Sequence, residues 1–148
     1  MIMPDESERI TKEDYEALAT FRFHLRQFVR FSEEGARILG ITPQQHQAML
    51  AVKGQPDREW ASIGEIAHFL QIQPHAAVGL VNRCVQAGLL DRSADPDDRR
   101  GVRVMLTEKG SELLAQLSER NLRELRTLQQ TLSLDWTAAV RDLHGKPE

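Results

Sequence analysis

Residues 62–106 decide the fold of this chain, and they read SIGEIAHFLQIQPHAAVGLVNRCVQAGLLDRSADPDDRRGVRVML. Ser62 and Glu65 have the spacing of a capping box, which marks the start of a short helix. A four-residue break follows, and Pro74 suits the first position of a second helix, which Gly88 ends. Two helices joined by such a tight turn predict a helix-turn-helix unit.

The same stretch ends in a predicted β-hairpin. Residues 89–93 suit one strand, the charged segment 95–101 suits the turn, and residues 102–106 suit the return strand because apolar side chains alternate there. A hairpin directly after a helix-turn-helix is the wing of a winged helix. We therefore expect a recognition helix at about 74–87 and a wing at about 91–105.

A capped helix precedes this unit, and long amphipathic helices flank it. Thr42 and Gln45 form a second capping box, with Pro43 at the first helical position. Apolar residues recur at spacings of three and four in both long helices. These stripes are Leu18, Phe21, Leu25 and Phe28 in the first helix, and Leu114, Leu117, Leu125, Leu128 and Leu132 in the second, where the polar Asn121 occupies one position of the stripe. Since one chain offers the stripes no obvious core, we expect a two-fold homodimer to cover them.

The composition is ordinary for a globular protein. Of 148 residues, 41% are hydrophobic and 28% are charged, and no apolar run approaches the ~20 residues of a membrane span. The N-terminal MIMPDESERI is acidic and polar, which predicts no secretory signal. The single cysteine excludes an internal disulfide and fits a reducing cytoplasm. The net charge is −3, but residues 72–106 hold five arginines and four aspartates, so this part is slightly basic.

Two motifs lie in the wing and the recognition helix. The pattern D-x-R-x-x-x-V-x-L-T occupies residues 98–107 and is followed by Gly110, and LVNRCVQAGLLDR occupies residues 80–92. In this order the motifs resemble those of the MarR (multiple antibiotic resistance regulator) family of bacterial transcription factors, and the resemblance covers roughly residues 12–145. It implies a dimeric regulator, usually a repressor, of pseudo-palindromic duplex DNA, which many relatives release on binding a small-molecule effector.

The expected fold class is mainly α with a small β-wing: a winged helix-turn-helix whose long N- and C-terminal helices form a dimerisation domain. Residues 41–106 are the expected DNA-binding domain, and residues 11–40 and 107–145 the expected helical dimerisation region. Within the latter, a short break at 132–135 precedes a last helix that holds Trp136.

The candidate DNA contacts lie mostly on the predicted recognition helix and wing. Gln73 and His75 are the best polar base readers, and Arg83 lies one turn further, where it could meet a phosphate or form an ion pair inside the domain. Resemblance implies Arg99 or Arg100 as the contact of the wing, and we expect Asp98 to hold an arginine by a short ion pair. The whole candidate set is Ser62, Gln73, His75, Ala76, Gly79, Arg83, Asp98, Arg99, Arg100 and Arg103. The alternative for the wing is a solvated charged turn that contributes almost nothing.

Several other residues suggest different chemistry, but each has a simpler interpretation. Cys84 lies on the inward stripe of its helix, where a small buried hydrophobe is expected rather than a redox switch. His24 or His46 could line an effector pocket, or be a hydrogen-bonded or surface histidine. Trp60 is interpreted as a packing residue. Because no metal-site spacing, catalytic order or phosphate loop is present, we predict no metal, no cofactor and no enzyme. The functional alternative is a winged-helix module that binds protein rather than DNA.

Overall fold

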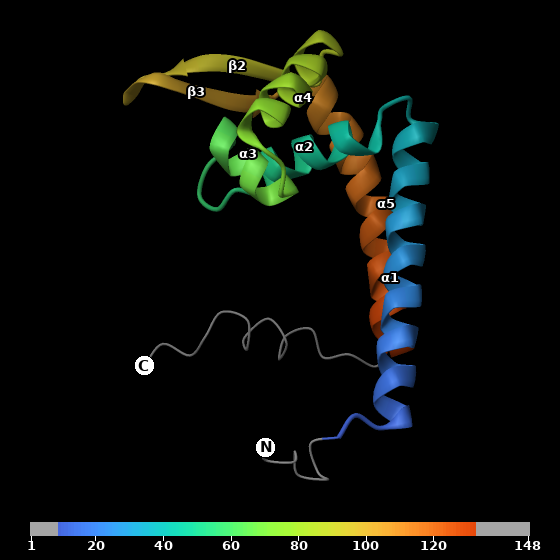
Figure 1. Cartoon of the computed structure of the whole chain (residues 1–148). Coiled ribbons are helices and arrows are strands. Elements are labelled where there is room, and N and C mark those ends of the chain that lie inside the picture. The colour runs from blue at the N-terminus through green and yellow to red at the C-terminus, as the bar shows by residue number, and fades with distance from the viewer. Residues whose placement is uncertain (1–8, 133–148) are drawn as a thin grey trace, which may run out of the picture. The chain divides into compact units, whose positions relative to one another are not determined.

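The computed structural model describes residues 9–132 (Figure 1). In chain order its elements are α1 (Lys12–Ile38), α2 (Pro43–Lys53), β1 (Trp60–Ser62), α3 (Ile63–Leu70), α4 (Pro74–Gln86), β2 (Leu90–Asp95), β3 (Asp98–Leu106) and α5 (Glu108–Leu132). They divide into two compact units, one made of Ser32–Arg120 and the other of the described residues on either side, 9–31 and 121–132.

Local capping signals determine where the central helices begin. The Thr42 side chain accepts a hydrogen bond from the Gln45 backbone, and the Gln45 side chain accepts one from the Thr42 backbone. Ser62 and Glu65 do the same at the start of α3. Each pair satisfies backbone N–H groups that have no partner within the helix. Both predicted capping boxes are therefore confirmed, as is the start of α4 at Pro74.

The sheet differs from the predicted hairpin in two respects. It has three antiparallel strands in the order β1-β3-β2, because Trp60–Ser62, for which the sequence predicts no strand, pairs with β3. The predicted seven-residue turn is also wrong, since β3 already begins at Asp98 and only Pro96 and Asp97 lie between the strands. Three residues are too few to reveal an alternation, and aspartate and glycine disfavour strands in isolation. Pairing with a neighbouring strand overrides both signals.

The hydrophobic core of the Ser32–Arg120 unit lies between its helices and the base of the sheet. Met49 of α2, Ile66 of α3, Val81 of α4, Leu90 of β2 and Val104 of β3 are all fully buried. Burial of such side chains is the main favourable contribution to folding. The core therefore fixes α4 and the base of the β2–β3 hairpin, while the hairpin projects beyond the helices of the unit (Figure 1).

A close backbone contact joins the end of α4, the start of β2 and the start of α5. The Thr107 hydroxyl donates to the Gly88 carbonyl at 2.6 Å and accepts from the Gly110 N–H at 2.9 Å. A Cβ atom on Gly110 would lie 2.1 Å from the Leu89 carbonyl oxygen, a distance that only glycine avoids. Gly88 itself has φ +75°, in the left-handed region that ends helices. These contacts explain the threonine and the glycine that close the wing motif.

The second unit exposes much apolar surface. Its exposed large apolar side chains are Ile10, Tyr15, Leu18, Phe21, Phe23, Leu25 and Val29 around and on α1, and Leu122 and Leu125 on α5. The predicted leucine stripe of α5 is therefore buried at one end and exposed at the other. Leu114 and Leu117, which belong to the Ser32–Arg120 unit, are buried. The predicted break at 132–135 and last helix around Trp136 lie outside the described residues. Between residues 9 and 132, no helix combines the length and the apolar character needed to cross a bilayer.

Candidate nucleic-acid interface

Helix α4 presents a smooth outward face with few polar groups. His75, Ala76 and Val78 are exposed and Gly79 is half-buried, whereas the opposite face is buried through Ala77, Leu80, Val81 and Cys84. Gln73 is exposed just before the helix and makes no capping hydrogen bond through its side chain. Gln73 and His75 are therefore accessible for contact with another molecule. Val78, which the sequence analysis did not include, is 39% exposed on the same face.

Arg83 folds back along this face toward α2. Its Nη1 atom lies 3.4 Å from the position that a Cβ atom on Gly79 would take. Arg83 also lines a cavity of about 210 Å³ together with Ala76 of α4 and the side chains of Gln44 and Gln47 of α2. The cavity therefore brings one cation and two amides beside the outward face of α4. Sequence reasoning missed the two glutamines, although their spacing of three in a capped helix places them on one side.

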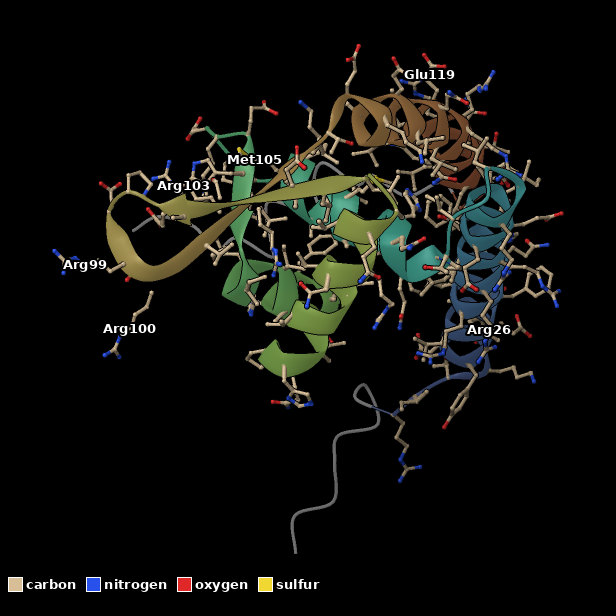
Figure 2. The ribbon with its side chains drawn as sticks, turned by 90° about the horizontal axis from the view of Figure 1, so that it is seen from above. Arg26, Arg99, Arg100, Arg103, Met105 and Glu119 are labelled. Atoms are coloured by element: carbon tan, nitrogen blue, oxygen red, sulfur yellow. The ribbon has the colours of Figure 1, made fainter. Side chains whose placement is uncertain are left out.

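The tip of the β2–β3 hairpin presents two arginines outward. Arg99 and Arg100 are exposed, and Figure 2 shows both pointing away from the turn. The Arg100 backbone N–H donates to Asp98 Oδ1 at 3.0 Å, so Asp98 shapes the turn. The prediction that Asp98 forms an ion pair with an arginine is wrong, because the ion pairs of the described residues do not include it. Its short side chain is instead used by the local backbone.

Arg103 is the arginine that the acidic residues hold. Its Nη2 atom lies 3.3 Å from Asp95 Oδ1 and 3.2 Å from Asp97 Oδ2. Its guanidinium carbon lies 4.1 Å from the centroid of the Trp60 ring, within the range of a cation–π contact. The Arg103 side chain is only 24% exposed. Arg103 thus makes its contacts inside the unit, unlike Arg99 and Arg100.

Ser62 has a structural role that its sequence spacing already indicated. Its hydroxyl accepts the Glu65 N–H at 3.1 Å, and both residues line an open cavity of about 360 Å³ with His68 and Phe69. Burial raises the pKa of Glu65, but hydrogen bonds from Ser62 and Arg58 and the charge of Arg58 outweigh this effect and hold it below its ordinary value. Glu65 therefore remains charged at neutral pH.

The residues that suggested other chemistry lie in the interior or make local contacts. Burial raises the pKa of the Cys84 thiol to about 11, despite the nearby positive charge of Arg83. His46 is 2% exposed, and burial lowers its pKa. His24 Nδ1 lies 3.1 Å from Gln27 Oε1 on the same helix. Over residues 9–132, no group of three or more His, Cys, Asp or Glu side chains could hold a metal ion.

Residues 39–101 match the model of the MarR family. A curated relative, the HTH-type transcriptional regulator Hpr of Geobacillus thermodenitrificans (strain NG80-2), is 35% identical over 88 residues, which are 58% of this chain and 40% of that protein. The chain thus spans less than half the length of this relative.

Two solved structures share the fold over nearly the whole chain. AbsC, a MarR family transcriptional regulator from Streptomyces coelicolor, has a TM-score of 0.71 at 18% identity, with 95% of this chain and 94% of that chain covered. A mutant MarR from E. coli complexed with operator DNA has a TM-score of 0.66 at 21% identity, with 92% of this chain and 96% of that chain covered. At these identities the likeness establishes the fold alone.

Proposed function

We propose, on the premise that this chain belongs to the MarR family of transcriptional regulators, that it is a cytoplasmic homodimeric repressor of pseudo-palindromic duplex DNA. One observation carries this proposal. A single compact unit combines an accessible face of α4 with a projecting hairpin whose Arg99 and Arg100 point away from the turn. A helix that fits the major groove and a hairpin beside it that presents two exposed arginines suit duplex DNA. A protein bound to an operator blocks access of other proteins to that DNA, and for this reason we propose repression of transcription.

The two elements would read DNA in different ways. The start of α4 would enter the major groove, where Gln73 and His75 offer hydrogen bonds and Val78 offers an apolar contact to a thymine methyl group. Arg99 and Arg100 would reach the minor groove, whose narrow A·T-rich segments attract arginine. Arg83 and the glutamines of α2 would contact phosphates, which position the protein without reading sequence. Ala76 and Gly79 offer little hydrogen bonding, so part of the specificity would come from DNA shape.

The homodimer is supported by the apolar surface of the second unit. Leu18, Phe23 and Val29 on α1 are 58%, 56% and 44% exposed, and Leu122 on α5 is 47% exposed. Large apolar side chains that are exposed in such number on two helices favour a partner that covers them. A two-fold dimer would present two copies of α4 to half-sites about one helical turn, ~34–36 Å, apart. Sedimentation velocity of the full chain would test this, and a monomer at micromolar concentration would contradict it.

The proposed function is tested by selecting binding sites from a random duplex pool. We expect the wild-type protein to enrich a near-palindromic site, and the Arg99→Ala/Arg100→Ala variant to lose most of its affinity while it still folds and dimerises. Because two cations leave the DNA surface, the slope of log K against log salt should fall by about two.

A matched control removes two positive charges elsewhere. Arg37 and Lys53 are exposed, and each is already paired with a glutamate. The Arg37→Ala/Lys53→Ala variant should therefore keep its affinity within about twofold. If no site is enriched at ~0.15 M salt while the wild type is a folded dimer, DNA binding is the wrong function and a protein-binding module takes its place.

Release by an effector is the finer part of the proposal. A cavity of about 270 Å³ lies between α2, the end of β3 and α5, lined by Leu50, Lys53, Leu106, Ser111, Leu114, Ala115 and Ser118. A mostly apolar lining with one cation suits a small aromatic anion. Such a ligand would act by favouring a conformation with lower affinity for DNA. Benzoate is a suitable first probe: it should raise the melting temperature and weaken DNA binding, and the Leu114→Trp variant should lose both responses.

A further inference from the structure

A continuous line of side-chain contacts runs from the first turn of α3 to the turn of the hairpin. Glu65 forms an ion pair with Arg58, whose guanidinium carbon lies 4.2 Å from the centroid of the Trp60 ring. Arg103 stacks on the same ring at 4.1 Å and holds Asp95 and Asp97. Trp60 thus sits in contact with two guanidinium groups, one from the helix-turn-helix side and one from the wing.

This contact lies where the hairpin leaves the sheet. Strand β1 pairs with β3 from Trp60, opposite Met105, to Ser62, opposite Arg103. Toward the turn, β3 pairs with β2 alone. Two-stranded ribbons twist and bend more easily than a three-stranded sheet. Arg103 is therefore the residue at which a supported sheet becomes a projecting two-stranded hairpin.

The charges around Arg103 are costly for a DNA-binding tip unless they have another use. Asp95 is 17% exposed and Asp97 is 87% exposed, and both lie within a few residues of Arg99 and Arg100. Carboxylates at such positions repel the phosphate backbone. Both instead bind Arg103, and Asp95 Oδ1 also accepts the Asp97 N–H at 2.9 Å. Asp95 and Asp97 thus both hold the same guanidinium group.

We propose that Trp60 is the positioning residue of the wing, and that Asp95 and Asp97 raise DNA affinity by holding Arg103 against its ring. The proposal rests on the proposed function, since it assumes that the wing contacts DNA. Trp60 and Arg103 are connected to Arg99 and Arg100, the arginines proposed to contact DNA, only through the backbone of the hairpin. Their effect comes from limiting the directions that the tip samples, so that less conformational freedom is lost when DNA binds.

The proposal reverses the sign that simple electrostatics predicts for one substitution. Asp95→Asn removes a negative charge from the tip but keeps the Oδ1 acceptor that the turn uses. We expect about 3- to 10-fold weaker DNA binding, the range of one partly exposed ion pair together with a weakened cation–π contact. Asp91→Asn is the matched control, because Asp91 is exposed on the same strand and takes part in none of the ion pairs of the described residues. It should bind DNA equally or more tightly.

Substitutions of the ring complete the test. Trp60→Ala should weaken binding by a similar factor, and Trp60→Phe should restore most of it because a ring face remains for both guanidinium groups. For both Asp95→Asn and Trp60→Ala the slope of log K against log salt should stay at the wild-type value, since no contact to phosphate is lost. Circular dichroism and thermal unfolding of each variant identify any that fails to fold, and Asp95→Asn then decides the outcome alone.

The measurement is fluorescence anisotropy of a labelled duplex that carries the selected site, titrated at several salt concentrations. If the wild type binds but Asp95→Asn matches or exceeds it, as Asp91→Asn is expected to do, the positioning role is wrong while the regulator stands. If Trp60→Ala lowers the salt slope, the ring region contacts DNA directly and the proposal also fails. Absence of binding by the wild type would refute the proposed function itself.

Discussion

Helix α4 and the tip of the wing lie in the same compact unit, but different forces hold them. The inward face of α4 is apolar and fully buried through side chains such as Leu80 and Val81. The wing tip is held by Arg103, which contacts Asp95, Asp97 and the Trp60 ring at a partly exposed site. Apolar burial is insensitive to moderate salt, whereas partly exposed ion pairs are screened by it.

The difference indicates a division of labour within the proposed interface. The core fixes the direction of α4 firmly, and the outward face of this helix then carries few polar groups. The wing carries the charged groups and is positioned by contacts that are each individually weak. Sequence reading would therefore come from a rigid element, and attraction to phosphates and the minor groove from an adjustable one. Four predictions test this comparison.

The largest effect is expected where the core supports α4. Leu80 is 2% exposed, so Leu80→Ala should lower the free energy of unfolding by about 2–5 kcal/mol through lost burial and a residual cavity. Val78→Ala, on the exposed face two residues earlier, should change it by less than about 0.5 kcal/mol. Urea titrations followed by circular dichroism measure both. Equal effects at the two positions would contradict a firmly packed α4.

The second effect concerns the thiol on the inward face of the same helix. Raising its pKa from 9.0 to about 11 lowers the thiolate fraction of Cys84 about 100-fold at neutral pH, and burial restricts access further. Native protein should therefore react with a thiol-specific disulfide reagent at least ~100-fold more slowly than protein in denaturant. A native thiol that reacts as fast as the denatured one would show that the face opens and would revive a redox role.

A smaller effect is expected from pH. His46 is buried and its folded-state pKa is lowered, so the unfolded chain binds the proton more readily. Stability from this residue is therefore complete above the unfolded pKa of about 6.5 and is lost as the pH falls below it toward the folded pKa. The midpoint of urea unfolding should decrease between pH 7 and pH 5. His46→Leu should flatten this dependence.

The smallest effect is a difference in unfolding free energy between two glutamate substitutions. One glutamate belongs to the line of contacts through Trp60, and the other belongs to an isolated ion pair. Lys53 and Glu59 lie 2.7 Å apart with side chains 53% and 77% exposed, so Glu59→Ala should change the free energy of unfolding by less than about 0.5 kcal/mol. Glu65→Ala removes a capping-box acceptor as well as the partner of Arg58, and should cost about 1 kcal/mol. Thermal unfolding distinguishes the two, and equal losses would mean that Glu65 is no more than a surface charge.

The predictions from sequence succeeded where a few neighbouring residues decide the outcome. The capping boxes at Thr42 and Ser62 and the start of α4 at Pro74 each depend on side-chain and backbone groups within four residues. The inward position of Cys84 followed from helical periodicity in the same way. The exposed side chains of α4 agree with the face that this periodicity predicts, although their contacts with DNA stay a prediction.

The contacts of the wing were less predictable for two reasons. The strand that pairs with β3 is distant in sequence, and the aspartates near the turn differ only in the direction that the strand gives their side chains. β1 pairs with residues more than 40 positions later, and a three-residue strand has no periodic signal of its own. The register sets Asp95 opposite Asp98 with an irregularity between Ala94 and Asp95. That irregularity helps to decide which carboxylate faces which arginine. Asp98 is therefore the arginine partner that the sequence predicts, whereas Asp95 and Asp97 hold Arg103 in the structure.

By itself the sequence determined where α2, α3 and α4 begin and which face of α4 is buried, because each follows from local backbone hydrogen bonding and periodicity. Its residue types also gave the hairpin its charged character. Only the tertiary structure decided that Trp60 lies between two arginines and that Arg103 is held internally while Arg99 and Arg100 point outward. It also placed Gln44 and Gln47 beside Arg83. The physical reason is that the interaction energy of a charged side chain depends on the atoms within a few ångströms of it. Strand pairing across about 40 residues determines which atoms those are.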